Sequence, residues 1–430
     1  MNFHKTVIFL SFLFLGLTGF SQKLTSEEKQ QALTSVAKLM DSIYVFPETA
    51  KEAIAYVKEQ QQKGVYEKID VPYEFADAVT RDLRAVTHDL HINMRYDPAG
   101  IEKEQKQAAG EEAGMTQEER LAMENYGFRE VKILPGNVGY LDLRFFYTPE
   151  AAGETAIAAM NLLANTDAII FDLRRNGGGN PEMIQLLQSY LFEQEPVHLN
   201  NFYFRPTDEN TQTWTLPYVP GKRNPNADVY VLTSNRTFSA GEEFTYDLKN
   251  LDRATIVGEK TGGGANPGST HNVTDKFMIF IPNGRAINPV SGTNWEGKGI
   301  APDVAVDEDK ALDTAHLMAV EKLLKNTESE EKKAFYEWEL KEIKARQNPV
   351  KLDPETLKAF TGGFGSNEVS LENGQLVYHA YDDEFRLTPI GNNEFLVEHV
   401  PYKRLKFSED RNSLSELSNL FPPVTRQRTK

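Results

Sequence analysis

The sequence predicts an α/β protein that has a helical N-terminal region and a small C-terminal β domain. In the middle of the chain, short β-prone runs alternate with helical patterns, as is typical of buried strands covered by helices. Before that region, apolar residues recur at helical spacing from Ser26 to about Tyr96. From Leu352 onward, strand-like runs are broken at Asn373-Gly374 and Gly391-Asn392, dipeptides that favour turns.

The N-terminal region is expected to be mainly helical. Ser26 is a candidate N-cap for its first helix, and further helical stretches cover residues 50–62 and 73–86. Residues 100–125 are rich in Glu, Lys, Gln and Ala. We expect them to form a solvated helix or a linker that is too short to hold a separate peptide-binding domain.

The α/β region is expected to contain six strands and three helices. The strands are predicted at 131–134, 138–146, 168–173, 229–233, 255–257 and 277–281. The helices are predicted at 149–164, 181–192 and 240–251. Residues 307–347 return to a charged helical pattern, which we expect to serve as a tether. The resulting domains are 1–21 (signal peptide), 22–100 (helical), 101–126 (charged linker), 127–325 (α/β), 326–350 (helical tether) and 351–430 (β).

The first residues have the pattern of a signal peptide. Lys5 supplies a positive charge, Val7 to Phe20 are mostly apolar, and Gly19 and Ser21 are small residues at a suitable spacing. Cleavage after Ser21 would leave Gln22 as the new N-terminus and export the protein to the periplasm or the outside. The apolar run is shorter than the roughly 20 residues of a membrane span, so no integral span is expected after cleavage.

Composition excludes several classes of site. The 430 residues include no Cys, which rules out disulfides, thiolate metal sites and a Cys nucleophile. The formal net charge of −16 argues against nucleic acid or an anionic membrane surface as a partner.

The first glycine-bearing segment is Asp-Leu-Arg-Arg-Asn-Gly-Gly-Gly at 172–179. It joins a predicted strand to a predicted helix whose first turn suits Pro181. Glycines here can turn backbone N–H groups toward an anion beside the helix N-terminus. The segment matches neither a Walker A loop nor a dinucleotide fingerprint. By itself it predicts either an anion-stabilising loop or a tight turn.

The second segment is Thr-Phe-Ser-Ala-Gly-Glu-Glu-Phe at 237–244. Ser239 lies where a predicted strand turns into a helix, a position that exposes a nucleophile beside the next backbone N–H. Serine is also a favoured N-cap, so the local sequence alone leaves both interpretations open. Ser234 is a competing candidate in the same loop.

The third segment is Gly-Glu-Lys-Thr-Gly-Gly-Gly-Ala at 258–265, followed downstream by Asn-Trp-Glu-Gly-Lys-Gly-Ile-Ala-Pro-Asp at 294–303. Its glycine density indicates backbone passing close to a bound chain or to another loop. A serine nucleophile also needs a base, and His88 and His91 lie where the helical region ends. The His-x-x-His pair could suggest a metal, but the sequence offers no clear further ligands for zinc.

Together these segments resemble the C-terminal-processing (tail-specific) serine peptidases, in the family's order and spacing. The resemblance covers about residues 30–310 and is closest to the interphotoreceptor retinoid-binding protein-like and tricorn-like branch. It implies a ClpP/crotonase-like core, with Ser239 as nucleophile and an oxyanion hole at Gly178 and Ala240. It also implies substrate binding along the neighbouring glycines, Gly177, Gly179, Gly263 and Gly264.

The resemblance further implies His91 as general base and Glu296 as the residue that orients or polarises the site. Relatives with a lysine base carry it 25 residues after the nucleophile, where this chain has Gly264, and Lys260 lies at the wrong offset. Tricorn-type sites place a Ser before the His, whereas this chain has Leu90. The expected activity is cleavage of peptide or protein-tail amide bonds without metal or organic cofactor. The alternative is a non-catalytic carrier of a hydrophobic ligand or peptide on the same fold.

Overall fold

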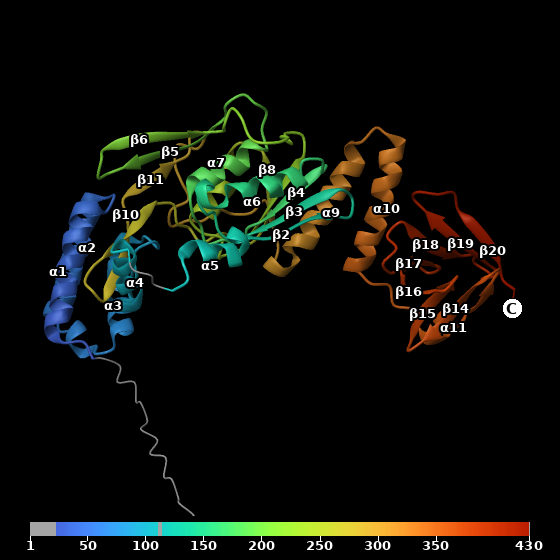
Figure 1. Ribbon diagram of the computed structural model, residues 1–430, viewed down its shortest axis with the longest axis horizontal. Coiled ribbons are helices and arrows are strands. Elements are labelled where there is room, and N and C mark those ends of the chain that lie inside the picture. The colour runs from blue at the N-terminus through green and yellow to red at the C-terminus, as the bar shows by residue number, and fades with distance from the viewer. Residues whose placement is uncertain (1–22, 111–113, 430) are drawn as a thin grey trace, which may run out of the picture. The chain divides into compact units, whose positions relative to one another are not determined.

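The computed structural model describes residues 23–110 and 114–429 (Figure 1). The predicted signal peptide, residues 1–21, lies outside the described residues. The chain divides into two compact units, of which one is Met1–Ala113 with Gly268–Asn283 and the other is Gly114–Pro267 with Gly284–Lys430.

The first unit is built on the predicted helices, which are α1 (Ser26–Ile43), α2 (Pro47–Gln62) and α3 (Pro72–Thr87), with a 3₁₀ turn at Tyr66–Lys68. It also contains α4 (Pro98–Ala108), which begins the segment expected to be a solvated helix or a linker. The prediction of Ser26 as N-cap is wrong by one residue, because Thr25 holds that position. The Thr25 hydroxyl accepts the N–H of Glu28, whose carboxylate accepts the N–H of Thr25, so the two residues form a capping box.

A small antiparallel sheet completes this unit. Its order is β1 (Asn93–Tyr96), β10 (Phe277–Pro282) and β9 (Gly268–Asn272). Asn93 pairs with Phe280, so a hairpin from late in the chain joins the strand that follows α3. Such a pairing is non-local, and no local pattern in the sequence indicates it.

The second unit contains the predicted α/β layer. Its six-stranded sheet has the order β12 (Val304–Ala305), β8 (Ala254–Gly258), β7 (Asp228–Thr233), β4 (Ala168–Asp172), β3 (Val138–Leu143) and β2 (Phe128–Leu134). All neighbours are parallel except β2, which runs antiparallel to β3. The carboxyl ends of β3, β4, β7 and β8 therefore lie along one edge. The first glycine segment, the Ser239 loop and the third glycine segment begin there, after β4, β7 and β8.

Successive side chains in these strands alternate between two buried faces, as the pleat requires. Leu141, Phe171 and Val231 face a core shared with α6 (Pro149–Leu162), α7 (Pro181–Ser189) and α8 (Ala240–Asn250). Tyr140, Ile170 and Leu232 face a second core shared with α9 (Glu308–Asn326) and α10 (Glu330–Gln347). The result is a sheet covered by helices on both sides, as the alternating pattern predicts.

The second unit also contains a separate small sheet and a short helix. A second sheet has the order β11 (Gly284–Ile287), β5 (His198–Phe204) and β6 (Glu209–Trp214). Helix α5 (Gln117–Met123) and a 3₁₀ turn at Asn125–Gly127 precede β2.

The C-terminal residues form the small β domain. After α11 (Pro354–Lys358), eight strands pair in chain order as antiparallel neighbours. A bridge between Phe364 and Arg428 links the first strand to the end of the last, so the sheet closes on itself. The strands are Gly362–Phe364, Asn367–Glu372, Gln375–Ala380, Asp383–Pro389, Glu394–Val397, Lys403–Phe407, Ser413–Ser418 and Val424–Gln427 (β13–β20).

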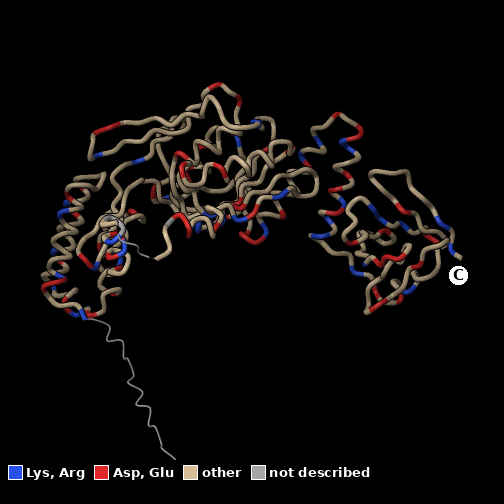
Figure 2. Tube along the Cα trace, in the orientation of Figure 1, with Lys and Arg blue, Asp and Glu red and all other residues tan. Residues whose placement is uncertain are grey.

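The turn predicted at Asn373-Gly374 is present, because both residues have positive φ, of 50° and 82°, between β14 and β15. Within residues 23–110 and 114–429, no helix has the length and apolar composition needed to cross a membrane. Acidic and basic residues are interspersed along the described elements, as in α10 (Figure 2).

Candidate active site

Ser239 lies at a sharp elbow between β7 and α8. It has φ 53° and ψ −121°, a region that costs a non-glycine residue backbone strain and differs from the extended conformation of an ordinary N-cap. The N–H groups of Glu242 and Glu243 donate to the Ser239 carbonyl oxygen at 2.8 and 2.9 Å. Main-chain geometry thus begins the helix at this serine.

Gly178 of the first glycine segment packs directly against this elbow. It has φ 119°, and a Cβ built on it would lie 2.8 Å from the Ser239 Cβ, 3.3 Å from Oγ and 3.4 Å from the Ala240 nitrogen. Any side chain at this position would occupy the space beside the serine hydroxyl. The structure therefore brings Gly178, Ser239 and Ala240 together.

The backbone donors of these residues differ. The N–H of Ala240 has no acceptor among the described residues. The N–H of Gly178 donates to Oδ1 of Asn176 at 2.9 Å. Asn176 is fully buried, donates to the Leu143 carbonyl at 3.0 Å and accepts the Phe238 N–H on its own carbonyl. It ties the glycine segment to the end of β3 and to the elbow.

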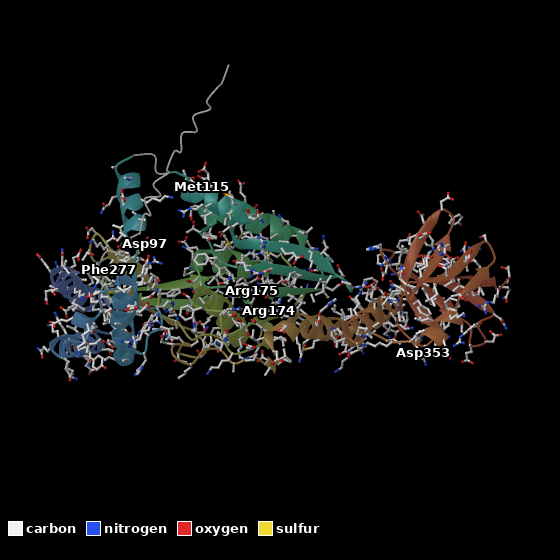
Figure 3. All side chains as sticks on the ribbon, turned by 90° about the horizontal axis from the view of Figure 1, so that it is seen from below. Asp97, Met115, Arg174, Arg175, Phe277 and Asp353 are labelled. Atoms are coloured by element: carbon white, nitrogen blue, oxygen red, sulfur yellow. The ribbon has the colours of Figure 1, made fainter. Side chains whose placement is uncertain are left out.

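An ion pair anchors the start of the same segment. The Arg174 guanidinium, labelled in Figure 3, donates to both carboxylate oxygens of Asp172, and the Tyr140 hydroxyl donates to one of them at 2.7 Å. Burial acts to raise the pKa of Asp172, but the Arg174 and Tyr140 bonds outweigh it and lower that pKa. The carboxylate therefore stays ionised and fixes the chain where it leaves β4.

The third glycine segment follows β8 and runs against the loop at 294–303. Gly263 has φ 93°, and a Cβ there would lie 2.9 Å from the Gly299 nitrogen. The Gly297 N–H donates to the Gly263 carbonyl at 2.9 Å, and the Trp295 indole donates to the Gly264 carbonyl at 2.7 Å. The glycine density predicted that this backbone passes close to a bound chain or to another loop. The structure shows the other loop, residues 294–303.

Glu296 belongs to that second loop. Its carboxylate accepts the N–H groups of Ala265 and Asn266, at 2.5 and 3.2 Å. Within this unit, Glu296 therefore holds the end of the third glycine segment.

The two other candidates have structural surroundings. Ser234 is buried, donates its hydroxyl to the Arg174 carbonyl at 2.6 Å and accepts the Arg236 N–H. Lys260 is exposed on the loop after β8. The Ser234 hydroxyl is held by the backbone and so is not placed as an activated nucleophile, and Lys260 is not a buried base.

Comparison with known proteins places this region in a family. Residues 137–306 match the model of "Peptidase family S41". These are the residues that carry Gly178, Ser239, Gly263 and Glu296. Residues 137–306 form a peptidase family S41 domain.

Relatives agree with this S41 match. A protein named "Probable CtpA-like serine protease" in Staphylococcus aureus (strain bovine RF122 / ET3-1) is 26% identical over 179 residues, which are 41% of this chain and 34% of that protein. The chain thus spans about a third of the length of the curated relatives it matches. The predicted resemblance to tail-specific serine peptidases is confirmed at the level of the family.

Two solved structures are also similar. The photosystem II D1 C-terminal processing protease is 15% identical, with a TM-score of 0.41 over 66% of this chain and 94% of that chain. The tricorn protease is 13% identical, with a TM-score of 0.41 over 68% of this chain and 36% of that chain.

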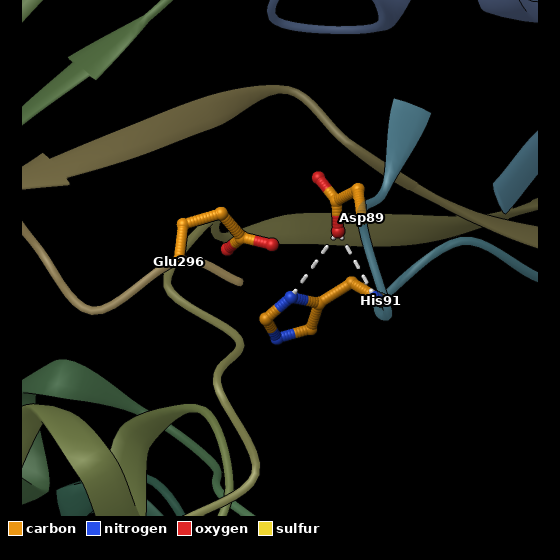
Figure 4. A group of neighbouring side chains, drawn as sticks. All are labelled: Asp89, His91 and Glu296. Carbon is orange, nitrogen blue, oxygen red and sulfur yellow. Dashed lines mark hydrogen bonds and ion pairs between the residues drawn. The ribbon is translucent and has the colours of Figure 1, made fainter. Parts of the chain in front are cut away.

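His91 lies outside the S41 match, in the first unit, just before β1. Asp89 accepts the His91 N–H at 3.0 Å, and its carboxylate lies 3.6 Å from the imidazole Nδ1 (Figure 4). The imidazole ring stacks on Phe280, with ring centroids 5.8 Å apart. The residue before it, Leu90, is 42% exposed.

Three residues that contact individual candidate residues or their loops were not singled out from the sequence. Asp89 could have been found as an Asp-x-His turn, in which the carboxylate caps a nearby N–H. Glu242 completes a Ser-x-x-Glu pattern, which is the signature of a capping box. Asn176 offered no signal beyond its place before the glycine triplet.

Proposed function

We propose that the protein is an active serine peptidase that cleaves amide bonds of peptides or protein tails through an acyl-enzyme on Ser239. The observation that carries this proposal is the elbow itself. A strained serine begins α8, the Ala240 N–H beside it has no acceptor among the described residues, and Gly178 leaves space against the hydroxyl. Strain of this kind is retained at nucleophiles because it exposes the side chain.

In this proposal His91 is the general base and Glu296 orients or polarises the site. Asp89 supports the first role, because a carboxylate near Nδ1 favours the tautomer that leaves Nε2 to accept a proton. Leu90 replaces the auxiliary serine of tricorn-type sites, so no hydroxyl from that position takes part. Lys260 has no role in the chemistry.

The reaction then proceeds in two balanced steps. His91 takes the hydroxyl proton while Ser239 Oγ bonds to the substrate carbonyl carbon, and that proton passes to the leaving amine as the amide C–N bond breaks. Water then attacks the ester carbon and gives one proton to His91, which passes it to Ser239 Oγ as the ester C–O bond breaks, releasing the peptide acid and the free serine. No metal or organic cofactor is needed for these transfers.

The oxyanion is proposed to bind the N–H groups of Ala240 and Gly178. Ala240 can donate directly, whereas Gly178 must give up or share its bond to Asn176. The gain is favourable, because a bond to a charged oxygen is stronger than a bond to a neutral amide oxygen. Gly177, Gly179, Gly263 and Gly264 are proposed to lie along the bound peptide.

We also infer that the α/β layer is of the ClpP/crotonase-like type, with helices α6–α8 supporting the catalytic loops. Its parallel strand order and the loops at the carboxyl ends of β4, β7 and β8 support this inference.

The test is labelling of the purified protein with a fluorophosphonate probe, beside peptide hydrolysis. Ser239→Ala should abolish both, and His91→Ala should reduce both by a factor on the order of 1,000. His88→Ala is the matched control from the same loop and should leave both unchanged. Absence of labelling in the wild type across probes and substrates would favour a ligand carrier instead.

Export is proposed from Lys5 and the apolar run that follows it. The check is expression of the full chain in a bacterium, followed by mass spectrometry of the periplasmic fraction. A protein that begins at Gln22 is expected, and recovery of the uncleaved chain in the cytoplasm would contradict the proposal.

A further inference from the structure

Glu242 is a fully buried carboxylate in the first turn of α8. One oxygen, Oε2, accepts the N–H of Ser239 at 3.0 Å and the N–H of Gly264 at 2.8 Å. The other, Oε1, accepts the N–H of Gly263 at 2.7 Å and the Thr261 hydroxyl. Four donors from two separate loops therefore converge on one side chain.

This set of donors favours the ionised form. An amide would point hydrogens at one of the N–H groups, whereas a carboxylate accepts on both oxygens. Burial raises the pKa of Glu242, and the four hydrogen bonds oppose that rise without cancelling it. The N-terminus of α8 also favours a negative charge at this position.

The two loops that meet at Glu242 are the ones assigned to the chemistry. Ser239 is the proposed nucleophile, and Gly263 and Gly264 are proposed to lie along the substrate. Of the main-chain contacts described for these loops, the Gly262 N–H to Thr237 carbonyl bond, at 3.0 Å, also joins them. Glu242 accepts three further backbone N–H groups, one from the Ser239 elbow and two from the third glycine segment, so its loss would loosen the loops relative to each other.

We propose that Glu242 is a positioning residue that locks the Ser239 elbow and the Gly263–Gly264 segment into one rigid unit. It sets where a bound peptide lies relative to the serine hydroxyl, and it touches neither the substrate nor the reacting atoms. The proposal rests on the proposed peptidase function for its consequence on rate, but its structural claim can be measured without activity.

The chain offers a matched control in the next residue. Glu243 is also buried in α8, but its side chain accepts a hydrogen bond from the side-chain amide of Asn200, at 3.2 Å, and among the described residues this side chain makes no hydrogen bond to either catalytic loop. Glu242→Gln and Glu243→Gln therefore make the same chemical change in the same turn of one helix. Lys260→Ala is a second control, on the exposed side of the third glycine loop.

The experiment measures fluorophosphonate labelling rate, kcat and KM for a peptide, and hydrogen exchange of residues 258–266. Glu242→Gln should lower the labelling rate and kcat on the order of 100-fold, the typical cost of a misplaced reacting group, and should speed exchange in 258–266. Glu243→Gln and Lys260→Ala should change the rates less than about threefold and leave that exchange slow. If Glu242→Gln does not fold, Thr261→Ala removes one donor and should shift both readouts in the same direction by about a tenth as much.

Wild-type-like exchange and rates in Glu242→Gln would overturn the inference, and so would an equal loss in Glu243→Gln. If the wild type neither labels nor cleaves, the peptidase proposal fails by itself. The exchange comparison then decides the positioning role alone: faster exchange only in Glu242→Gln supports it, and unchanged exchange overturns it.

Discussion

Helix α8 presents two buried acidic regions that differ in how their charge is satisfied. On the side of the catalytic loops, Glu242 accepts four hydrogen bonds, three of them from backbone N–H groups. On the side of the core, Glu243 and Asp247 lie one helical turn apart, where Asn200 donates to Glu243 at 3.2 Å and Asn288 donates to Asp247 at 3.3 Å.

Burial raises the pKa of all three acids, but only at Glu242 do four hydrogen bonds oppose that rise. Burial raises the pKa of Glu243, and burial together with the charge of Glu243 raises that of Asp247 well above its ordinary value. Two buried carboxylates with so few donors keep a proton between them. Burial alone therefore does not identify a functional acid. The number and origin of its donors separate an acid that organises loops from a pair that holds a proton.

Among the variants that test this comparison, Gly178→Ala, on the side of the catalytic loops, should have the largest effect. The new methyl group would press on Ser239 Cβ at 2.8 Å, in a backbone conformation that disfavours alanine. We expect labelling and turnover to fall by a factor of 100 or more, as when an oxyanion donor is lost. Gly391→Ala is the control, because a Cβ there meets nothing within 4 Å and Gly391 lies outside the proposed site. Equal losses in both variants would contradict the assignment.

Asn288→Ala disturbs the core side. Fully buried Asn288 accepts the N–H groups of Val290 and Ser291 and donates to Asp247 and the Leu199 carbonyl. Leaving these groups unpaired should lower the free energy of unfolding by about 2–3 kcal/mol, measured by urea denaturation. The labelling rate of the folded variant should stay near that of the wild type. A loss as large as that of Glu242→Gln would contradict the distinction between the two acidic regions of α8.

Glu243→Gln sharpens the comparison through pH. Because the folded state keeps a proton that the unfolded chain loses near its ordinary pKa of 4.5, wild-type stability falls as pH rises from about 4.5 to the raised value. Each unit of raised pKa corresponds to about 1.4 kcal/mol. As pH rises over this range, the unfolding free energy of the wild type should therefore fall relative to that of Glu243→Gln. A pH-independent difference would show that the pair holds no extra proton.

The smallest effect is expected at the outer end of α8. Lys249 pairs with Asp303, and their side chains are 31% and 40% exposed. Lys249→Ala should cost less than about 1 kcal/mol, and added salt should reduce that cost further. A larger loss in thermal unfolding would mean that this end of the helix carries more of the fold than its exposure indicates.

The sequence predicted much of the α/β layer, because alternating buried strands and the punctuation by Pro and Gly are local signals. Pro149 and Pro181 begin α6 and α7, and the strand ending at Thr233 leads to α8 as expected. The pairing of β10 with β1 was not predicted, since Phe280 and Asn93 are far apart in the chain and share no local pattern.

Less of the candidate site than of the α/β layer was predicted from the sequence. The contact among Gly178, Ser239 and Ala240 agrees with the roles that the family resemblance implied, though those roles remain proposals. Glu242 was not recognised, because a glutamate three residues after a serine is first of all a capping-box residue. Its bonds to Gly263 and Gly264 come from a loop more than twenty positions away, and only the fold brings that loop to the helix.

The closure of the C-terminal sheet has a consequence for how that domain forms. Each strand pairs with its neighbour in the chain, so contacts within successive hairpins are local and can form early. The bridge between Phe364 and Arg428 joins residues about sixty positions apart, and its loop-closure entropy is offset only once the intervening strands are in place. Formation of the Phe364–Arg428 bridge should therefore be the last event in the folding of this domain. Until then its first and last strands are open edges, available for pairing with another chain.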